Sequence, residues 1–376
     1  MTHIEQMIQD MCPNGVEWKT LGEVCEIETG KLNANAAEEN GHYPFFTTSK
    51  EISYINEYKW DTEALLIAGN ANIGDVKHYI GKFNAYQRTY VLTNFQEGLI
   101  VRFLYHYTKA RLKDFLDDKK NEAAMSYIVL SSLQAFPIPL PPLEIQKKIV
   151  ECLDKFSALA AELQAELQMR RKQYEYYRTQ LLTPHSDCNS ADNTDDRNWE
   201  WKTLGEICEI NRGVRVVRSE LEQEGKYPVY QNSLAPLGYY DKCNYPANTT
   251  FIISAGAAGK VGYSDVDFWA ADDCLCIKCP KALNAKFLFY YMLDKQDFFL
   301  SQVRHASVPR MSRTIVENFK LPIPSLAEQA RIVAILDKFE KLITSMEEGI
   351  PAEQIRQQKR YEYYRDLLLT FDRKAV

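Results

Sequence analysis

Side chains that can hydrogen-bond to nucleic acid recur in two separate stretches of the sequence. Arginine suits guanine, asparagine and glutamine suit adenine, and serine, threonine and lysine suit phosphate. An exposed polar residue can equally well only solvate a loop, so the arginines at 212, 215 and 218, beside Gly213, are the most specific part of the pattern. The candidate DNA-binding residues are Lys31, Asn33, Asn35, Thr48, Ser49, Lys50, Asn70, Asn72, Gln87 and Arg88 in the first stretch, and Arg212, Arg215, Arg218, Gln231, Asn232, Ser233, Lys260, Arg304, Arg310 and Arg313 in the second.

Catalytic chemistry is not indicated by any motif. Residues 254–261 (SAGAAGKV) resemble a phosphate loop, but the first glycine and the Ser or Thr after the lysine are missing. The Glu-Trp-Lys triplets at 17–19 and 200–202 echo the end of a nuclease active site, yet no acidic partner is placed near them. Six histidines form no Ser/His/Asp or Cys/His arrangement, and no methyltransferase motif is present. We therefore predict no catalytic residues.

The cysteines predict neither a metal site nor a disulfide framework. Cys274, Cys276 and Cys279 are closely spaced, but we expect successive side chains of one strand to point to opposite faces, and a fourth ligand is missing. Nine scattered cysteines fit a reduced compartment. The sequence has no basic start followed by an apolar run, which would indicate export. It also has no stretch of roughly 20 apolar residues, which would indicate a membrane span. We expect a cytoplasmic chain without a membrane partner.

Length and composition favour two globular domains. The chain has 376 residues, of which 45% are hydrophobic and 26% charged, which excludes disorder throughout, collagen and a simple coiled-coil rod. The formal charge of −6 argues mildly against nucleic acid, because a phosphate backbone is bound mainly by Lys and Arg. Part of that acid lies in residues 184–198, which hold four aspartates against one arginine. This polar segment is typical of a flexible linker.

An internal repeat organises the whole chain. The block at 17–27 (EWKTLGEVCEI) recurs at 200–210 (EWKTLGEICEI), and the block at 153–156 (LDKF) recurs at 336–339, both at an offset of 183. A third block, 174–178 (YEYYR), recurs at 361–365, now at an offset of 187. Such blocks indicate tandem duplication of one unit. Between them, residues 28–135 and 211–318 diverge almost completely, which favours two readers of different targets on one frame; drift of unconstrained loops is the alternative.

A heptad seam follows each divergent stretch. Apolar residues recur at alternating spacings of three and four, which is typical of a helix packed against another helix. An amphipathic helix lying on its own domain is the alternative. In the second copy Gly349 and Pro351 should break or bend the helix, next to an extra step of four in the seam. The predicted helix-pairing residues are Ile149, Leu153, Phe156, Leu163, Leu167, Tyr174, Tyr177, Leu181, Ile332, Leu336, Phe339, Ile343, Met346, Tyr361, Tyr364 and Leu368.

The expected fold class is α/β. Strand-type runs at 64–68 and 249–254, and aromatic-rich helix candidates at 99–105 and 287–292, predict a mixed domain in each copy. If the two long helices pair as an antiparallel coiled coil, the copies are related by a pseudo-twofold internal repeat. The expected domains are a first recognition domain at 1–143, a central spacer helix at 144–183, the linker at 184–198, a second recognition domain at 199–326 and a C-terminal spacer helix at 327–376.

Taken together, these motifs resemble the specificity (S) subunits of Type I restriction-modification systems. The resemblance rests on the repeated EWKxLG blocks, the Pro-Ile-Pro entries at 137–139 and 322–324, and the runs from Gln146 to Phe156 and from Gln329 to Phe339. The segments 307–313 (SVPRMSR) and 358–368 (QKRYEYYRDLL) are also similar to that family. In one departure, the first helix lacks the Gly-x-Pro-Ala-Glu element found at 349–353, so the helices should be unequal.

The resemblance implies a non-catalytic DNA-reading adaptor. Each divergent stretch would be a target recognition domain for one half of an asymmetric bipartite site in double-stranded DNA, with half-sites about one helical turn apart. The paired helices would set the spacing and dock two methyltransferase (M) subunits, and motor-nuclease (R) subunits would join them. AdoMet, Mg and ATP would be bound by these partners and by no residue of this chain. A metal-dependent nuclease and a purely structural dimerisation adaptor are the rival classes.

Overall fold

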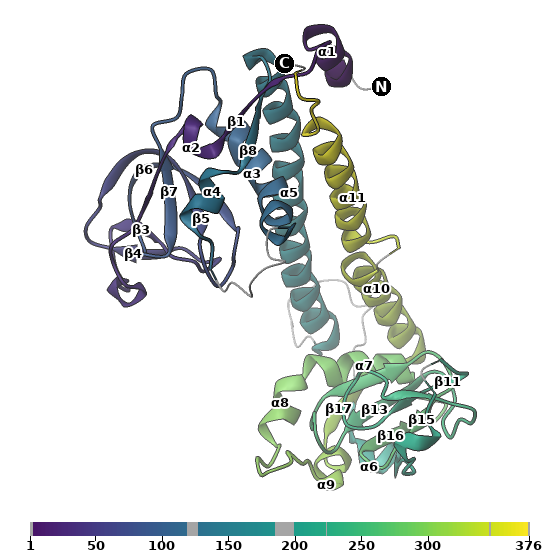
Figure 1. The fold of residues 1–376 in the computed structure, drawn as a ribbon. Coiled ribbons are helices and arrows are strands. Elements are labelled where there is room, and N and C mark those ends of the chain that lie inside the picture. Colours follow the sequence, from purple (N-terminus) through teal and green to yellow (C-terminus); the bar gives the residue numbers. More distant parts are fainter. Residues whose placement is uncertain (1–2, 119–126, 185–198, 223, 346, 375–376) are drawn as a thin grey trace, which may run out of the picture. The chain divides into compact units, whose positions relative to one another are not determined.

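The chain folds into two compact units, which we describe separately. The computed structural model describes residues 3–118, 127–184, 199–222, 224–345 and 347–374. Unit 1 comprises Met1–Gln164 and Gln354–Val376, and unit 2 comprises Ala165–Glu353. Each unit holds β-sheets, shorter helices and part of the long helices, so the α/β prediction is confirmed (Figure 1).

Unit 1 is built on a six-stranded sheet with the order β2-β7-β5-β6-β3-β4. The predicted strand at 64–68 is the second half of β5. A separate two-stranded pair, β1 with β8, joins the first repeated block to the first Pro-Ile-Pro entry. The strands are β1 (Glu17–Thr20), β2 (Glu26–Thr29), β3 (Tyr43–Phe46), β4 (Ser53–Ile55), β5 (Trp60–Ala68), β6 (Val76–Ala85), β7 (Thr89–Thr93) and β8 (Pro137–Leu140).

The large sheet of unit 1 is tightly coiled. Strand β6 ends near the start of β5, where Phe83 faces Trp60, whereas β7 begins at the other end of β5, where Thr89 faces Ala68. Residues 86–88 alone connect β6 to β7, and so short a link spans at most about 14 Å. Because the nine residues of β5 cover about 30 Å, the strands must bend strongly for the end of β6 to come near the start of β7.

Helix α3 (Val101–Asp118) covers the large sheet of unit 1, and the other short helices lie around it. Helix α3 buries Phe103 and Leu104 against β5 and β7. In α2 (Leu21–Val24) the Glu23 carboxylate accepts hydrogen bonds from the Thr20 backbone NH and hydroxyl, which forms a capping box. The remaining helices are α1 (His3–Met11), the 3₁₀ turn η1 (Ala34–Ala36) and α4 (Leu130–Gln134).

Unit 2 repeats this plan with shorter strands. Its sheets have the orders β10-β16-β13-β14 and β12-β11-β15, and β9 pairs with β17 as β1 pairs with β8. Its strands are β9 (Glu200–Thr203), β10 (Glu209–Arg212), β11 (Tyr227–Tyr230), β12 (Gly238–Tyr240), β13 (Thr249–Ile253), β14 (Val261–Ser264), β15 (Trp269–Ala270), β16 (Cys274–Lys278) and β17 (Lys320–Ile323). Its shorter helices are α6 (Leu204–Ile207), η3 (Arg218–Glu220), α7 (Ala285–Asp294), α8 (Gln296–Ser301) and α9 (Arg313–Glu317).

Strand β16 corrects our reasoning about the cysteines. Cys274 and Cys276 are two positions apart, so their side chains share one face of the strand and pack in one cluster with Phe251 and Phe268. The expectation that all successive cysteines alternate was wrong for this pair. Both thiols are buried in an apolar environment, and burial raises the pKa of Cys274 to about 12. These two cysteines therefore serve as core residues.

The two long arms are unequal, as predicted. The first is one continuous helix, α5 (Leu143–Leu182). The second is divided into α10 (Leu326–Thr344) and α11 (Ile350–Leu368), and the interruption falls at the Gly349 region where a break was expected. A Cβ at Gly349 would lie 2.6 Å from the Leu342 carbonyl oxygen, so the tight connection requires glycine.

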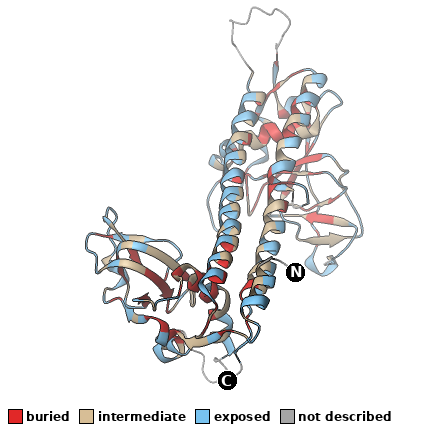
Figure 2. Cartoon of the chain, turned by 90° about the horizontal axis from the view of Figure 1, so that it is seen from above, coloured by how far each residue is buried: buried red, intermediate tan, exposed pale blue. Residues whose placement is uncertain are grey.

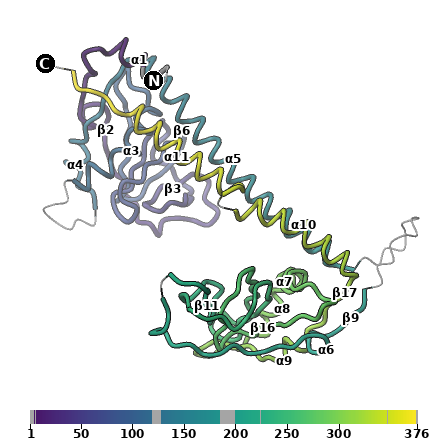
Figure 3. The backbone as a smooth tube through the Cα atoms, turned by 90° about the vertical axis from the view of Figure 1, so that its right-hand side faces the viewer, coloured from purple at the N-terminus to yellow at the C-terminus, as the bar shows by residue number. Residues whose placement is uncertain are grey.

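The arms pair antiparallel, with each unit holding a part of the pairing. In unit 1 the Phe156 ring stacks on Tyr364, 5.5 Å between centroids, and further along α5 Gln164 accepts a hydrogen bond from Gln354. Figure 3 shows α11 running beside α5. In unit 2 the Tyr177 ring stacks on Phe339 of α10 at 5.6 Å.

Most of the predicted helix-pairing residues lie on the inner faces of the arms. Tyr177 is the most exposed of them, although it stacks on Phe339, and Leu182 is more deeply buried than the predicted Leu181. Met346 and the linker residues 185–198 lie outside the described residues. The buried positions are Ile149, Leu153, Leu167, Tyr174, Ile332, Leu336, Ile343 and Leu368, and the half-buried ones are Phe156, Leu163, Leu181, Phe339, Tyr361 and Tyr364.

A buried glutamine begins each arm. Gln146 is fully buried; its amide NH₂ donates to the carbonyls of Gly98 and Pro141, and its carbonyl accepts from the Ile100 NH. Gln329, the equivalent residue of the second copy, makes the same three bonds in unit 2, to Ala282, Pro324 and Asn284. Figure 2 shows the buried stripes that these helices present. Each glutamine fastens an arm to the loop that precedes α3 or α7.

An aspartate further along each arm also joins arm to unit. In unit 1, Asp154 lies 2.7 Å from Arg102 and 2.8 Å from His106. Burial lowers the pKa of His106, although the Asp154 carboxylate opposes that shift. In unit 2 the equivalent Asp337 accepts a hydrogen bond from the Tyr290 hydroxyl, so the titrating group of unit 1 is replaced by a phenol.

Candidate nucleic-acid interface

Five chain segments converge at one end of the coiled sheet in unit 1. The Gln87 NH donates to the Leu32 carbonyl, and the Gly69 NH donates to the Arg88 carbonyl. The Ile128 NH in turn donates to the Gly69 carbonyl. These bonds unite three of the segments with the chain that enters α4. The five segments are residues 30–36, 47–50, 69–75, 86–88 and 127–128.

The same convergence is repeated in unit 2 by the same backbone bonds. The Ser254 NH donates to the Asp273 carbonyl, as Gly69 does to Arg88, with an offset of 185. The Met311 NH donates to the Ser254 carbonyl, as Ile128 does to Gly69. The five segments are residues 213–218, 231–233, 254–260, 271–273 and 304–311. Although the sequences diverge, the two copies therefore build one loop platform, which we call the loop cluster of each unit.

Close backbone approach explains a glycine in each loop cluster. A Cβ at Gly30 would lie 1.9 Å from the Ala85 carbonyl oxygen, and a Cβ at Gly213 would lie 2.2 Å from that of Ala270. Such a contact cannot be relieved by turning a side chain, because the obstacle is backbone. The two glycines align at the main offset of the repeat and are required at the same place in each copy.

The predicted residues of the first copy fall within its loop cluster but differ in availability. Lys31, Asn33, Asn35, Ser49, Lys50, Gln87 and Arg88 are exposed. The Gln87 amide donates to the Asn33 side-chain oxygen at 2.9 Å, which holds two adenine-type readers side by side. Thr48 is buried, and the half-buried Asn72 donates its amide NH₂ to the Thr48 carbonyl. Asn70 is half-buried and pairs through its backbone with Tyr127.

The second loop cluster is richer in arginine and contains carboxylates. Burial and the neighbouring Asp272 raise the pKa of Asp273, and the positive charges of Arg310 and Arg212 partly oppose that shift. Gln231 also hydrogen-bonds to the Asp273 side chain. Three predicted residues, Arg212, Gln231 and Arg310, therefore favour the charged form of one acid.

The other predicted residues of the second copy differ in exposure and in their partners. Arg215, Arg218, Asn232, Lys260 and Arg304 are exposed. Arg313 is exposed at the start of α9, where its guanidinium pairs with Glu317 of the same helix at 2.8 Å. The half-buried Ser233 donates its hydroxyl to the Ala235 carbonyl. Arg304 and Arg310 exchange backbone hydrogen bonds, which closes the loop between them as a small hairpin.

Three residues in the loop clusters were missed by sequence reasoning. Tyr127 is exposed and lies under the Arg88 guanidinium, 5.8 Å from the ring centroid. Asp272 and Asp273 occupy the positions that Gln87 and Arg88 occupy in the first copy. Aligning the two copies at an offset of 185 would have found the acids, and an offset of 183 pairs Tyr127 with Arg310.

The described residues hold no cluster of three or more His, Cys, Asp or Glu side chains that could bind a metal ion. Among the helices of those residues, none has the length and apolar character needed to cross a membrane. The chemistry that the loop clusters offer is hydrogen bonding by arginine, amide, hydroxyl and carboxylate groups.

Comparison with known proteins identifies the family of both copies. The model of the Type I restriction modification DNA specificity domain matches residues 13–169 and again residues 196–354. A putative type I restriction enzyme specificity subunit of Haemophilus influenzae is 31% identical, over 98% of each chain. The specificity subunit of the Type I restriction enzyme EcoR124I/EcoR124II of Escherichia coli is 30% identical, over 99% of this chain and 97% of that protein.

Solved structures show the same fold. The S subunit of a Type I restriction-modification system from M. genitalium superposes with a TM-score of 0.60 at 18% identity, over 94% of this chain and 95% of that one. A chain from a study of complex assembly and conformational transition of the type I R-M system gives 0.59 at 17% identity, over 95% and 98%. With two matched specificity domains and full-length relatives, the chain belongs to the specificity subunits of Type I restriction-modification systems, the DNA-recognition rather than the catalytic members of those systems.

Proposed function

We propose that each loop cluster reads one half of an asymmetric bipartite site in double-stranded DNA. One observation carries this proposal: the two copies keep the same backbone bonds at the loop cluster and change almost every side chain that the cluster exposes. A scaffold that preserves its geometry while its exposed polar groups vary is suited to reading two different base sequences. The recognition domains would be residues 1–143 and 199–326.

The side chains suggest different base preferences for the two copies. In the first copy Asn33 and Gln87 lie within hydrogen-bonding distance of one another, and amide side chains favour adenine. In the second copy the charge of Arg310 acts on Asp273, and arginine favours guanine while a carboxylate accepts a bond from the cytosine amino group. We therefore infer a half-site richer in G·C pairs for the second copy.

The paired arms would set the spacing of the half-sites and dock two M subunits. The arms are residues 144–183 and 327–376, and residues 184–198 are the linker between the copies. R subunits would join that complex to restrict unmethylated DNA. Exposed apolar side chains on the arms, among them Met169 and Tyr363, are available for such docking. AdoMet, Mg and ATP would be bound by these partner subunits. Their basic surfaces would also supply phosphate contacts that a chain of charge −6 lacks.

The deciding experiment is to sequence the methylome of the source cell with and without this gene. We expect one bipartite adenine-methylation motif to disappear on deletion and to return on complementation. With intact partner genes, persistence of every such motif would contradict the proposal.

Exchange of the first insert, residues 28–135, tests the division of labour. Replacing it with the insert of a relative should change one half of the motif and leave the other half and the spacing unaltered. A change in both halves would show that the copies do not read independently. Sequence-selective binding by the complex separates this function from a purely structural adaptor, and metal-dependent cleavage by the isolated chain would favour the nuclease alternative.

A further inference from the structure

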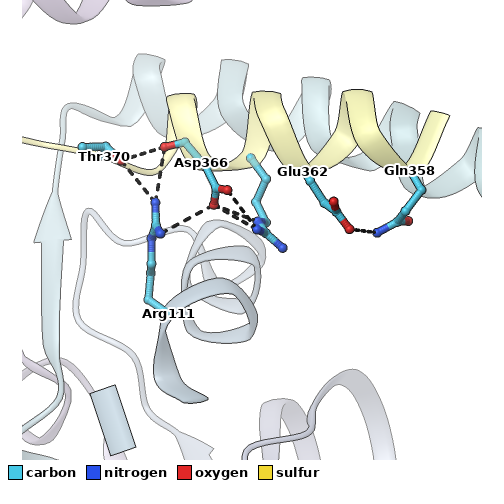
Figure 4. A network of polar contacts seen from close by, with 6 residues as sticks. Arg111, Gln358, Glu362, Asp366 and Thr370 are labelled. Carbon is cyan, nitrogen blue, oxygen red and sulfur yellow. Dashed lines mark hydrogen bonds and ion pairs between the residues drawn. The ribbon is translucent and has the colours of Figure 1, made fainter. Parts of the chain in front are cut away.

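A basic residue in the middle of α3 contacts an arm in unit 1. Arg111 of α3 has one guanidinium nitrogen 3.5 Å from the Asp366 carboxylate of α11. Its other terminal nitrogen donates to the Asp366 carbonyl and to the Thr370 hydroxyl, at 3.3 and 3.2 Å. Arg365 also pairs with the Asp366 carboxylate, at 3.0 Å. One acid thus lies between two arginines, as Figure 4 shows for Arg111, Asp366 and Thr370.

Unit 2 has the same kind of network with the acid in the other element. Asp294, the last residue of α7, accepts from the Thr179 hydroxyl at 2.7 Å and lies 3.4 Å from the Arg178 guanidinium of α5. Lys295 pairs with the same carboxylate at 3.0 Å. The Asp294 side chain is only 3% exposed, so this acid depends on its basic partners.

Alignment of the copies shows that the acid has been relocated. At an offset of 184, α3 and α7 match (FLYHY against FLFYY), which pairs Arg111 with Lys295 and Ala110 with Asp294. At an offset of 187 the arms match, which pairs Arg365 with Arg178 and Asp366 with Thr179. Both basic positions are kept in both networks. The acid comes from the arm in unit 1 and from the recognition domain in unit 2.

Each network joins residues of different copies. In unit 1 the first recognition domain contacts the second arm, and in unit 2 the second recognition domain contacts the first arm. If the first domain met the arm of its own copy, Arg111 would face Arg178 with Ala110 and Thr179 alongside, and no acid would separate the two cations. If the second domain met its own arm, Asp294 and Asp366 would both be present. Like charges brought together in this way reject a mismatched partner.

We propose that the relocated aspartate is a pairing code. It favours contact between each recognition domain and the arm of the other copy, and it disfavours contact with the arm of the same copy. The interaction surface is the turn of α3 around Arg111 in unit 1, or the end of α7 in unit 2, with the facing turn of the arm. The partner of each recognition domain is the arm of the non-identical copy, so the pairing code disfavours association of two identical copies. This inference concerns assembly of the chain itself and holds whichever bases the loop clusters read.

The test inverts the code in the full-length chain without changing its net charge. The variant T179D/D366T exchanges the arm residues and mismatches both networks, so unit 1 loses its acid and unit 2 gains a second. We expect thermal unfolding to shift down by about 5 °C, given that about 1 kcal/mol corresponds to roughly 2–4 °C for units of this size. Adding A110D and D294A to this variant gives each network one acid again. The acid then comes from α3 in unit 1 and from α5 in unit 2. This fourfold variant should recover more than half of the lost Tm.

A control variant on the same arm is available. Glu362 is exposed and accepts a hydrogen bond from Gln358 of its own helix (Figure 4), so E362Q should leave Tm within about 1 °C. Amide hydrogen exchange of residues 106–118, 285–301 and the facing arm segments locates the effect, which should be faster in T179D/D366T and restored in the fourfold variant. The proposal is wrong if the fourfold variant is as unstable as T179D/D366T. It is also wrong if the Tm loss of the fourfold variant equals the sum of the losses of its separate substitutions, because the positions then do not share a partner.

Discussion

The loop clusters of the two units share backbone geometry and differ in chemistry. Equivalent amides donate to equivalent carbonyls at Gly69 and Ser254, while Gln87 and Arg88 in one unit are replaced by Asp272 and Asp273 in the other. The backbone bonds are satisfied within the chain, so the exposed side chains can change without loss of the platform. Under the proposed function, specificity and stability are therefore supplied by separate groups, and each can be perturbed alone.

The largest expected effect comes from adding a methyl group to the glycine of each loop cluster that lies against a backbone carbonyl. Gly30→Ala and Gly213→Ala should each lower the free energy of unfolding by about 3 kcal/mol, because a Cβ would overlap a backbone carbonyl in both units. Urea unfolding followed by circular dichroism measures the loss. Gly98→Ala is the control: its φ is +85° but nothing lies within 4 Å of the added Cβ, so about 1 kcal/mol is expected. Equal losses at Gly98 and Gly30 would show that the close approach is not the cause.

The buried glutamines provide the next test of equivalence. Gln146→Leu and Gln329→Leu each leave three backbone groups without their partner, and we expect each to cost about 2–3 kcal/mol of unfolding free energy. The exposed Gln358→Leu should change stability by less than about 0.5 kcal/mol. If one of the two substitutions left the free energy of unfolding unchanged, the two glutamines would not have equivalent roles in their arms.

Substitution in the loop clusters should sharpen the difference between the copies. Arg310→Ala should weaken specific DNA binding by the assembled complex by about 1–3 kcal/mol and relax one base position in the second half-site. Gln87→Ala should relax a position in the first half-site only. Binding to a library of sites with every base varied measures both effects. Arg313→Ala, whose guanidinium is engaged by Glu317, serves as control; uniform weakening across all sequences with Arg310→Ala would indicate a phosphate contact instead.

The smallest expected effect is a pH dependence confined to unit 1. The pKa of His106 is lowered by burial from its ordinary value of 6.5, so the unfolded chain takes up the proton first as the pH falls. Unit 1 is then fully stable above about pH 6.5 and loses stability below it. Arg102 and Lys109 also disfavour the charged ring. Because Asp154 has a lowered pKa, its own contribution is lost only as the pH falls below its ordinary value of 3.8.

Thermal unfolding between pH 7.5 and 5 measures this effect. His106→Phe should remove the loss in unit 1, and unit 2, which has Tyr290 at the equivalent position, should change little over the same range. An unchanged pH dependence in the His106→Phe chain would assign the loss to another group.

Local and repeated features could be predicted from the sequence. The seam residues Leu153 and Leu336 recur at helical spacing, and Gly349 interrupts the second arm as expected, because these signals depend on neighbours along the chain. The assembly of the loop clusters could not be predicted. It depends on how far the sheet coils and on bonds such as that from Ile128 to Gly69, which join residues far apart in the sequence. For the same reason Thr48 was a candidate contact although the fold buries it.

The division of the chain has a consequence for its synthesis. Unit 2 is one continuous stretch, Ala165–Glu353, whereas unit 1 needs Gln354–Val376 in addition to Met1–Gln164. During translation the first segment of unit 1 therefore emerges before unit 2, but the α11 residue that stacks on Phe156 emerges after the whole of unit 2. Unit 2 can complete its core while unit 1 still exposes the apolar face of α5. Unit 1 is thus begun before unit 2 and completed after it, so its apolar surface needs protection from aggregation for longer.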